Sequence, residues 1–380
     1  MKKIALILTL LTCLVLFFAS TEYSFAQQNP STQNPQQKFY TGKVVKIPKQ
    51  GEQNIAGVKM PYQVVQIKIL DGNNQGKIIT LNYGKDSKIT PSQQVTVGDT
   101  VILQYIQNNY MIYDKYRLTN ILYVFLAFFF LCCIIAGWKG FGSILGLSIS
   151  LCVIMFYMLP QILSGANPLQ TSIITSLIIL FITTYLAHGI SKQTTVALIA
   201  TFISLLLTVW ISSFLVQITQ LTGINDETST LLFGPTSHIN LSGLLLAGII
   251  IGTLGALNDI TTTQSATIFS LAKQDKKASF KKLFATGFSI GREHIVSMVN
   301  TLVLAYAGSA LTLLLFFILN PQKIPYWVIL NNEAISDEII RTLAGSMGLI
   351  LVVPIVTLLA AIVCDKKTRS FLNRLFLSIR

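Results

Sequence analysis

The sequence predicts a polytopic all-α membrane bundle of about seven transmembrane helices, preceded by a signal peptide and a small all-β domain of the OB or SH3-like kind. Three observations support this class. Hydrophobic residues make up 52% of the chain and charged residues only 11%, whereas a soluble globular protein has roughly 25% charged residues. Seven apolar segments of about 20 residues lie between 118 and 363. A β-branched, water-soluble stretch precedes them.

The N-terminus, residues 1–26, has the three parts of a secretory signal. Lys2 and Lys3 form the charged start, Ile4–Phe18 the apolar region, and Ser24–Ala26 the small-x-small cleavage site. Residues 27–38 form a flexible polar linker of Gln, Asn, Pro and Ser. An uncleaved signal anchor is the alternative. Either form places the following domain outside the cytoplasm.

Residues 39–113 are predicted to form an extracytoplasmic β-rich domain. The β-branched runs Tyr40–Ile47 and Val64–Leu70 are followed by turn signals, and Lys77–Leu81 and Thr100–Ile106 bring the total to about five strands. A small antiparallel barrel fits that number of strands. The domain has no cysteine, so no internal disulfide holds it together. Because an exported domain has no access to nucleic acid, no nucleic-acid partner is expected.

The predicted β domain is basic. Eleven of the chain's 28 lysines and arginines lie between Lys38 and Arg117, together with five acidic residues. Either they form a solvated lysine-rich surface, or they form a basic face that touches anionic lipid or wall polymer.

The seven apolar segments are each long enough to cross about 30 Å of hydrocarbon. They are placed at 118–137, 141–159, 170–188, 194–219, 241–260, 295–319 and 340–363. With the N-terminus outside, thirteen lysines and arginines fall in the inner connections and the tail, and only Lys323 and Arg341 fall in the outer connections. This positive-inside pattern agrees with the signal peptide. We therefore expect a multipass protein of the bacterial cell membrane, with the lipid bilayer as partner, the N-terminal domain outside and the C-terminus in the cytoplasm.

The inner connection 273–292 carries six basic residues, and the basic cytoplasmic tail 364–380 carries five. Within the connection, Ser279–Phe288 has apolar residues at helical spacing and lysines off that stripe. Two interpretations stay open: a basic helix lying on the inner leaflet, or a docking helix for a cytoplasmic partner such as a nucleotide-hydrolysing subunit.

Small residues in the fifth and sixth segments predict close helix packing. Gly248, Gly252 and Gly255 recur at about one-turn spacing, and Gly308 belongs to a matching surface in the sixth segment. A homo-oligomer or a paralogous membrane partner is a further partner that the sequence leaves open.

A candidate polar site lies where the fifth and sixth segments approach the inner side. Asp259 and Arg292 are expected at a similar depth, where an ion pair between them is geometrically reasonable. Asn258 and Glu293 are their neighbours in the sequence, and Asn300 lies deeper, where a buried amide needs a partner. The group is interpreted either as a clamp that fixes two helix ends, or as a polar gate or an ion and proton site.

The sequence shows no catalytic constellation. It has no Walker-type phosphate loop, no HExxH motif and no Ser–His pair with supporting context, and no Cys or His spacing matches a structural zinc site. The histidines His188, His238 and His294 do not pair with a nucleophile at a recognisable spacing. Neither an enzymatic activity nor a metal or cofactor is therefore expected.

Four stretches carry a resemblance to known proteins: Gly252–Asp259, Ser265–Ala266, Ser289–Arg292 and Asn300–Gly308. Together they are similar to the YibE/F family of bacterial multipass membrane proteins, and the order of signal, exported β-rich domain and helical region is similar too. Glu293 stands where this family is expected to have an aspartate. The resemblance implies no established substrate, reaction or cofactor.

Two functions follow from these observations. The first is a transporter or permease component with a polar site at the inner mouth of the fifth and sixth helices. The alternative is a non-transporting membrane scaffold or sensor, whose exported β domain binds an envelope ligand or partner. An intramembrane enzyme would need a nucleophile or a metal site, and none was located.

Overall fold

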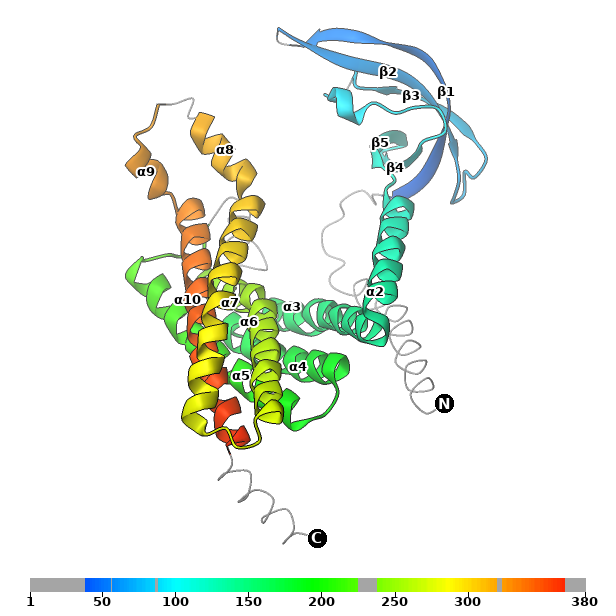
Figure 1. Ribbon diagram of the computed structural model, residues 1–380. Helices are drawn as coiled ribbons and strands as arrows, with labels where there is room; N and C mark the ends of the chain where they lie inside the picture. Colours follow the sequence, from blue (N-terminus) through cyan, green and yellow to red (C-terminus); the bar gives the residue numbers. More distant parts are fainter. Residues whose placement is uncertain (1–37, 56, 86–87, 225–237, 320–322, 366–380) are drawn as a thin grey trace. The chain divides into compact units, whose positions relative to one another are not determined.

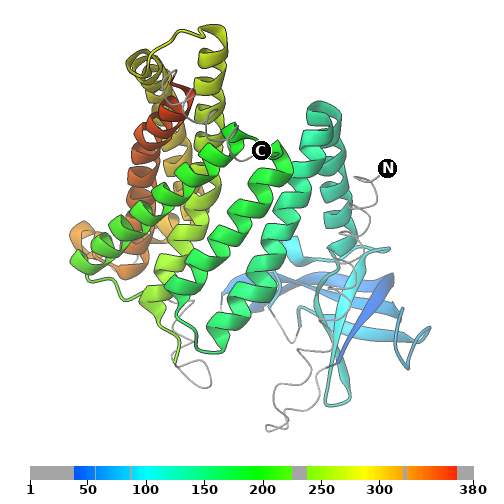
Figure 2. The same cartoon turned by 90° about the horizontal axis from the view of Figure 1, so that it is seen from below.

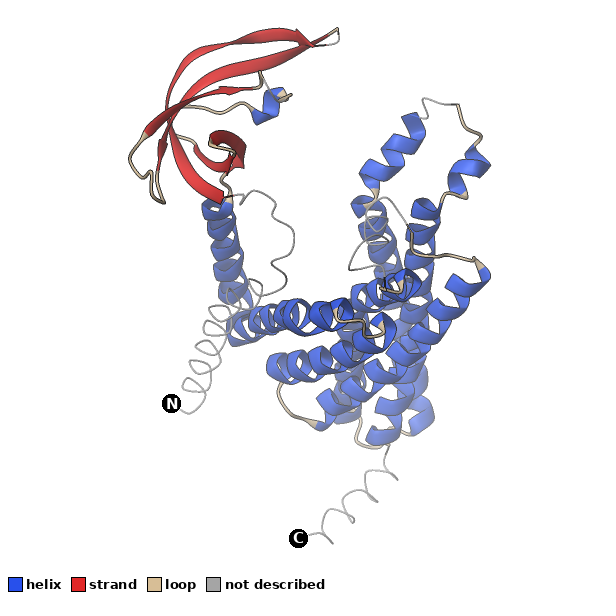
Figure 3. Ribbon diagram, turned by 180° about the vertical axis from the view of Figure 1, so that it is seen from behind, coloured by secondary structure: helices blue, strands red, loops and turns tan. Residues whose placement is uncertain are grey.

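The computed structural model describes residues 38–365 except 56, 86–87, 225–237 and 320–322. The predicted signal peptide, nearly all of the linker and the tail beyond Asp365 lie outside the described residues. The chain divides into two compact units, Met1–Ala127 and Phe128–Arg380, and each is described by itself. All described strands belong to the first unit, and helices make up the second (Figure 3).

The first unit contains one five-stranded antiparallel sheet, which confirms the predicted strand number. Its strands are β1 (Lys38–Ile55), β2 (Val58–Ile69), β3 (Ile78–Tyr83), β4 (Thr100–Ile106) and β5 (Asn109–Lys115), and a short 3-10 helix, η1 (Pro91–Gln93), precedes β4. The order across the sheet is β3-β2-β1-β4-β5, so β3 and β5 are its two edges. Register shifts between Val44 and Lys49 mark irregularities in the long β1.

Alternation along β2 builds the core of the sheet. Val65, Ile67 and Ile69 are completely buried, and polar or partly exposed residues lie between them. They pack with Val44 and Leu103 of the neighbouring strands. The unit therefore has a hydrophobic core of its own.

The helical part follows directly after the sheet. Its elements are α2 (Leu118–Val153), the π-helical turn η2 (Ile154–Met158), α3 (Leu159–Leu163), α4 (Pro168–His188), α5 (Lys192–Ile218), α6 (Leu241–Gln274), α7 (Phe280–Ser309), α8 (Leu311–Leu319), α9 (Tyr326–Leu330) and α10 (Glu333–Cys364). Five of the helices begin after an Asn or Ser whose side chain accepts a backbone N–H of the first turn; these caps are Asn167, Ser191, Asn240, Ser279 and Asn332.

The described residues contain five helices long and apolar enough to cross a membrane, or six if the bent pair α7 and α8 counts as one span. The sequence predicts seven. The difference arises at the start, because the segments expected at 118–137 and 141–159 belong to one helical run, Leu118–Leu163. That run is interrupted at Gly137, whose φ of 57° and ψ of −139° are not helical. Only glycine adopts this backbone conformation without strain.

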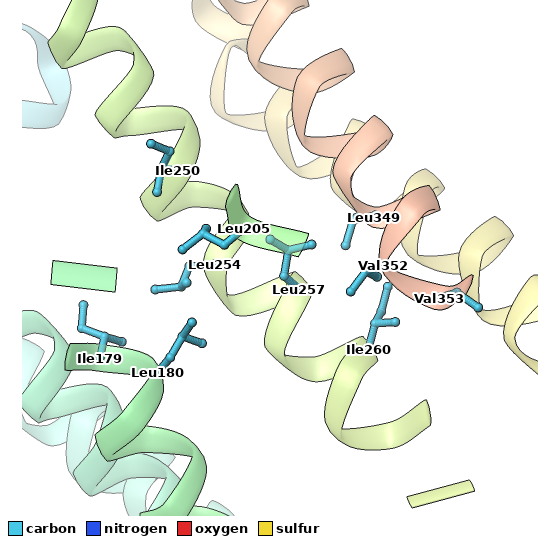
Figure 4. Packing of buried hydrophobic residues seen from close by; sticks show 10 residues of the cluster. All are labelled: Ile179, Leu180, Leu205, Ile250, Leu254, Leu257, Ile260, Leu349, Val352 and Val353. Carbon is cyan, nitrogen blue, oxygen red and sulfur yellow. The ribbon is translucent and has the colours of Figure 1, made fainter. Parts of the chain in front are cut away.

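The bundle is built around α6. Ile250, Leu254 and Leu257 of α6 lie between Leu180 of α4 on one side and Leu349 of α10 on the other (Figure 4). Leu205 of α5 completes the same core, and α7 packs along α10 (Figures 1 and 2). Since these core residues recur at helical spacing, each helix turns one apolar face inward.

The basic stretch 273–292 differs from its prediction. α6 continues to Gln274 and α7 already begins at Phe280, so only five residues connect the two helices. The expected surface helix is the start of α7; Leu283 of its apolar stripe is buried, and so is the neighbouring Gly287. The stripe faces α6 and α10 rather than lipid, because α6 extends far enough to provide a protein surface for it. Its lysines remain exposed.

Candidate functional site

The predicted polar site is distributed over the outside of α6 and α7. Asp259, Arg292, Glu293 and Asn300 are all exposed. The ion pairs among the described residues are Asp114–Arg117, Asp275–Lys282 and Glu338–Arg341. Asp259 and Arg292 therefore do not form the ion pair that their sequence positions suggested, and Asn300 is not the buried amide that was expected.

Asp259 and Asn258 turn toward α4 instead of α7. The hydroxyl of Thr184 on α4 donates to Oδ1 of Asn258 at 2.9 Å. His188 at the end of α4 lies within electrostatic range of Asp259, and Lys139 of α2 lies within range of His188. This corner of the bundle thus brings an acid, an imidazole and an amine together.

The glycines selected from the sequence mostly face open space. A Cβ added to Gly248, Gly255 or Gly308 would meet no atom within 4 Å, and only Gly252 faces another helix, with a Cβ position 2.7 Å from the Tyr306 hydroxyl. Close helix approaches occur at Gly287 and Gly291 of α7 and at Gly345 and Gly348 of α10. A one-turn spacing shows that two small residues share a face, but not what covers that face.

A buried amide joins three helices at one end of the bundle. Gln264 of α6 is 1% exposed. Its Nε2 donates to the carbonyl of Gly287 on α7 and to the hydroxyl of Thr357 on α10, each at 2.8 Å. The side chain fits because Gly291 has no side chain: a Cβ there would lie 3.0 Å from Nε2 of Gln264. Its Oε1 has no hydrogen-bond partner among the described residues.

A line of hydroxyl groups follows the inner face of α5. Thr201, Ser204, Thr208 and Ser212 recur three or four residues apart and are at most 1% exposed. Thr201 shares a hydrogen bond of 2.6 Å with the hydroxyl of Thr261 on α6. Within the described part of the chain, the hydroxyls of Ser204 and Ser212 have no partner.

A charged group lies near the start of α10. Asp337 is only 2% exposed, and its Oδ1 has no partner among the described residues. One turn further along, Arg341 forms a 3.2 Å ion pair with Glu338. Tyr306 of α7 lies within electrostatic range of both members of the pair, and its hydroxyl is buried. We call Tyr306, Asp337, Glu338 and Arg341 the α10 cluster.

The α10 cluster is not internally satisfied. Besides the Asp337 oxygen, Oε2 of Glu338, Nε of Arg341 and the Tyr306 hydroxyl are buried without a hydrogen-bond partner in the described structure. A cavity of about 210 Å³ adjoins it between α7, α8 and α10, with Tyr306 and Glu338 in its otherwise largely apolar wall. Such groups can bind a proton, a cation or the polar part of a solute that enters from the side.

Local contacts fix the start of α10. Asn332 caps the helix by accepting the N–H of Ala334, and Oε1 of Glu333 accepts the N–H and the hydroxyl of Thr222 and the N–H of Gly223. Glu333 thereby connects α10 to the chain that follows α5. The acid is also well placed for the positive end of its own helix.

The α10 cluster was not predicted from the sequence because the last helix was expected to start at residue 340, which assigned Asp337 and Glu338 to an outer loop. Two signals were present. Asn332 followed by Glu333 is a helix start with an acid in the first turn, and Glu338–Arg341 is a favourable pair at helical spacing. Neither signal enters a search by hydropathy. The three charged residues lower the mean hydropathy of any window that contains them, so the start of the helix falls outside the predicted span.

The comparisons with known proteins agree with the membrane architecture. The model of a family described as YibE/F-like protein matches residues 124–366, which include both α6–α7 and the α10 cluster. The chain therefore belongs to the YibE/F-like family. No curated protein and no solved structure matches it.

Proposed function

We propose that this YibE/F-like multipass membrane protein is a transporter or a component of a permease, and that its working site is the α10 cluster. The observation that carries the proposal concerns Asp337, which is 2% exposed in a helix apolar enough to span a membrane and whose Oδ1 has no partner among the described residues. An ionisable group in such a place is costly, and proteins retain it mainly where a solute, ion or proton passes.

A purely structural role explains the α10 cluster less well. A buried charge contributes to stability only when its partners satisfy it, and apolar residues of similar volume do as well or better. Here two carboxylate oxygens, one arginine nitrogen and one tyrosine hydroxyl have no hydrogen-bond partner among the described residues. A cluster of this kind is suited to bind a solute, an ion or a proton reversibly.

The route that we propose continues from the α10 cluster along the hydroxyl face of α5. Hydroxyl groups can exchange hydrogen bonds with a moving solute or water because each both donates and accepts. Thr201 and Thr261 carry the polar surface onward to Asn258, and the Asp259–His188 corner lies beyond it. In this proposal the α6–α7 residues predicted from sequence lie at the inner mouth, and Asp337 lies near the outer one.

The orientation belongs to the same proposal. The distribution of lysine and arginine favours an orientation with the β domain and the start of α10 outside, and with the α6–α7 connection in the cytoplasm. Seven crossings result if the chain reverses direction at Gly137, since 46 helical residues extend about 69 Å, more than twice the hydrocarbon thickness. The exposed lysines around 273–282 would then be available to a cytoplasmic partner.

The experiment is transport by the purified full-length protein in liposomes. We expect a flux of protons, Na⁺ or K⁺, followed with an enclosed pH dye and ion-selective electrodes, that Asp337→Asn reduces at least about tenfold. Glu52→Gln is the matched control, because it also neutralises one carboxylate but at an exposed site of the β domain. Equal flux in the wild type and Asp337→Asn would exclude the α10 cluster as the working site.

A non-transporting scaffold or sensor is the second candidate, and a cleft in the β sheet favours it. This candidate predicts that liposomes with the wild-type protein move none of the ions, whereas a ligand still binds the β domain. The two functions are thus distinguished by one pair of measurements on the same preparation.

A further inference from the structure

The β sheet contains a cleft that the proposed transport does not use but on which the second candidate function, ligand binding by the β domain, rests. It has a volume of about 610 Å³ and is lined by Ile79–Tyr83 of β3 and by Asn108–Ile112 at β5. Strands β3 and β5 are the two edges of the sheet, and no strand of the described part of the chain is hydrogen-bonded to either edge on the open side. The cleft therefore lies where the two unpaired edges approach each other.

The lining shows that main-chain atoms border the cleft. Neighbouring residues of a strand point to opposite faces, so an unbroken run of five residues can line a cleft only through the edge of its strand. In β3, Ile79 and Leu81 are the partly buried members, and Thr80 and Asn82 are exposed on the other face. All four contribute to the cleft.

The register identifies the free amide groups of β3. The N–H of Ile69 donates to the carbonyl of Lys77 at 3.0 Å. Hydrogen-bonded pairs recur every second residue in an antiparallel ladder, so Ile79 and Leu81 bond to β2. The N–H and C=O groups of Thr80 and Asn82 then point into the cleft, where they are ready to pair with another strand.

Charge indicates which strand would fit. The lining residues are uncharged, but Lys77 and Lys85 stand exposed at either end of β3, and the stretch from Lys38 to Arg117 has eleven basic against five acidic residues. These basic residues would attract a segment that carries carboxylates and would repel a basic segment.

We propose that the cleft binds an extended, acidic polypeptide segment of another protein, which adds a strand to the free edge of β3. Main-chain hydrogen bonds to Thr80 and Asn82 supply the affinity, and every second side chain of the segment enters the space toward Tyr110 of β5. The length of the lined edge, five residues, limits the recognised core to about five residues of the segment.

The test uses the full-length protein in detergent micelles and a fluorescein-labelled nine-residue peptide that alternates valine with glutamate, followed by fluorescence anisotropy. Thr80→Pro removes the free amide but no ladder bond, and proline is tolerated on such an edge. We expect it to weaken binding at least about tenfold, a change of about 1.4 kcal/mol. Thr80→Val keeps the amide and should bind within about twofold of wild type.

Three controls make the result decisive. The thermal melting of each variant shows whether its sheet is intact, and Asn82→Pro repeats the test should Thr80→Pro not fold. The same peptide with every second amide methylated, and its lysine counterpart, should bind at least tenfold more weakly. Equal binding of the methylated peptide, of both Thr80 variants, or of polyphosphate as a strandless polyanion would overturn the proposal. So would the absence of binding to the wild-type protein, or a second copy of the chain occupying the cleft.

Discussion

Gln264 on α6 and Thr357 on α10 hydrogen-bond through Nε2 and Oγ1 at 2.8 Å, and both side chains are essentially inaccessible to solvent. The same amide group donates to the carbonyl of Gly287, so one side chain connects α6, α10 and α7. The contact lies among apolar residues, where an unpaired polar group is costly. We therefore expect this contact to stabilise the packing of α7 against α6 and α10.

The first prediction concerns this contact. Gln264→Leu keeps the approximate volume but leaves the Gly287 carbonyl and the Thr357 hydroxyl without their donor, so we expect the free energy of unfolding to fall by about 1–2 kcal/mol. Unfolding in mixed micelles with increasing dodecyl sulfate, followed by far-UV circular dichroism, measures it. Thr262→Val is the matched control, because the Thr262 hydroxyl bonds only within α6. An equal loss for both variants would contradict the role of the interhelical contact.

The second prediction is that alanine at two different glycines changes the free energy of unfolding in opposite directions. A Cβ on Gly291 would overlap Cγ1 of Val353, a side chain with little rotamer freedom, so Gly291→Ala should destabilise the protein by about 1–3 kcal/mol. A Cβ on Gly255 would meet nothing within 4 Å, and alanine there should stabilise α6 by about 0.5–1 kcal/mol. The same unfolding assay compares them. Destabilisation by Gly255→Ala would mean that another molecule covers that face of α6.

These glycines show that the sequence predicts the positions of the helices but not which of their faces meet. Hydropathy located α4, α5, α6 and the apolar part of α10, because a run of apolar residues is needed wherever a helix crosses lipid. The same runs give no information on which face meets which neighbour, so Gly255 was selected and Gly287 was overlooked. The neighbour that a helix face contacts is determined by tertiary packing. Small residues spaced four apart occur both on faces that contact another helix and on faces that are open.

The candidate site shows the same limit. Asp259 and Arg292 were paired because both lie near the end of an apolar segment, but α6 continues for 15 residues beyond Asp259 and turns that side chain toward His188. Asp337 was overlooked because charge lowers local hydropathy. A search by hydropathy thus tends to exclude the charged residues within a membrane helix.

The third prediction separates stability from function in the α10 cluster. Asp337→Asn removes a buried charge whose Oδ1 has no partner in the described structure, so it should leave the free energy of unfolding unchanged or raise it by about 1 kcal/mol while transport falls. Arg341→Met leaves Glu338 without its cation, and we expect a loss of about 1–2 kcal/mol. A marked destabilisation by Asp337→Asn would show that the carboxylate is a structural group.

The fourth prediction tests which neighbour Asp259 has. A double-mutant cycle of Asp259→Asn and His188→Gln should give a coupling energy of at least about 0.5 kcal/mol, because residues within electrostatic range are not independent. The cycle of Asp259→Asn with Arg292→Gln should be additive, since both residues are exposed and form no ion pair with each other. Coupling in the second cycle alone would reverse the assignment and restore the pair expected from sequence.

The last prediction concerns pH and the short connection between α6 and α7. The hydrogen bond from Lys282 Nζ, at 2.9 Å, lowers the pKa of Asp275, and the N–H of Lys277 contributes to the same direction. A carboxyl whose pKa is lower in the folded protein binds fewer protons there than in the unfolded chain, where the value is about 3.9. The stabilising contribution of the Asp275 carboxylate is therefore fully present above the unfolded-state pKa and is lost as the pH falls through the lowered, folded-state pKa. We expect amide protection factors in 275–282 to be higher in the wild type than in Asp275→Asn at about pH 6, and the two to converge once the pH falls below the lowered pKa of Asp275. Because the pair is exposed, about 1 M salt should reduce the difference as well. A difference that persists unchanged at low pH would show that the asparagine disturbs the turn by another route than the loss of charge.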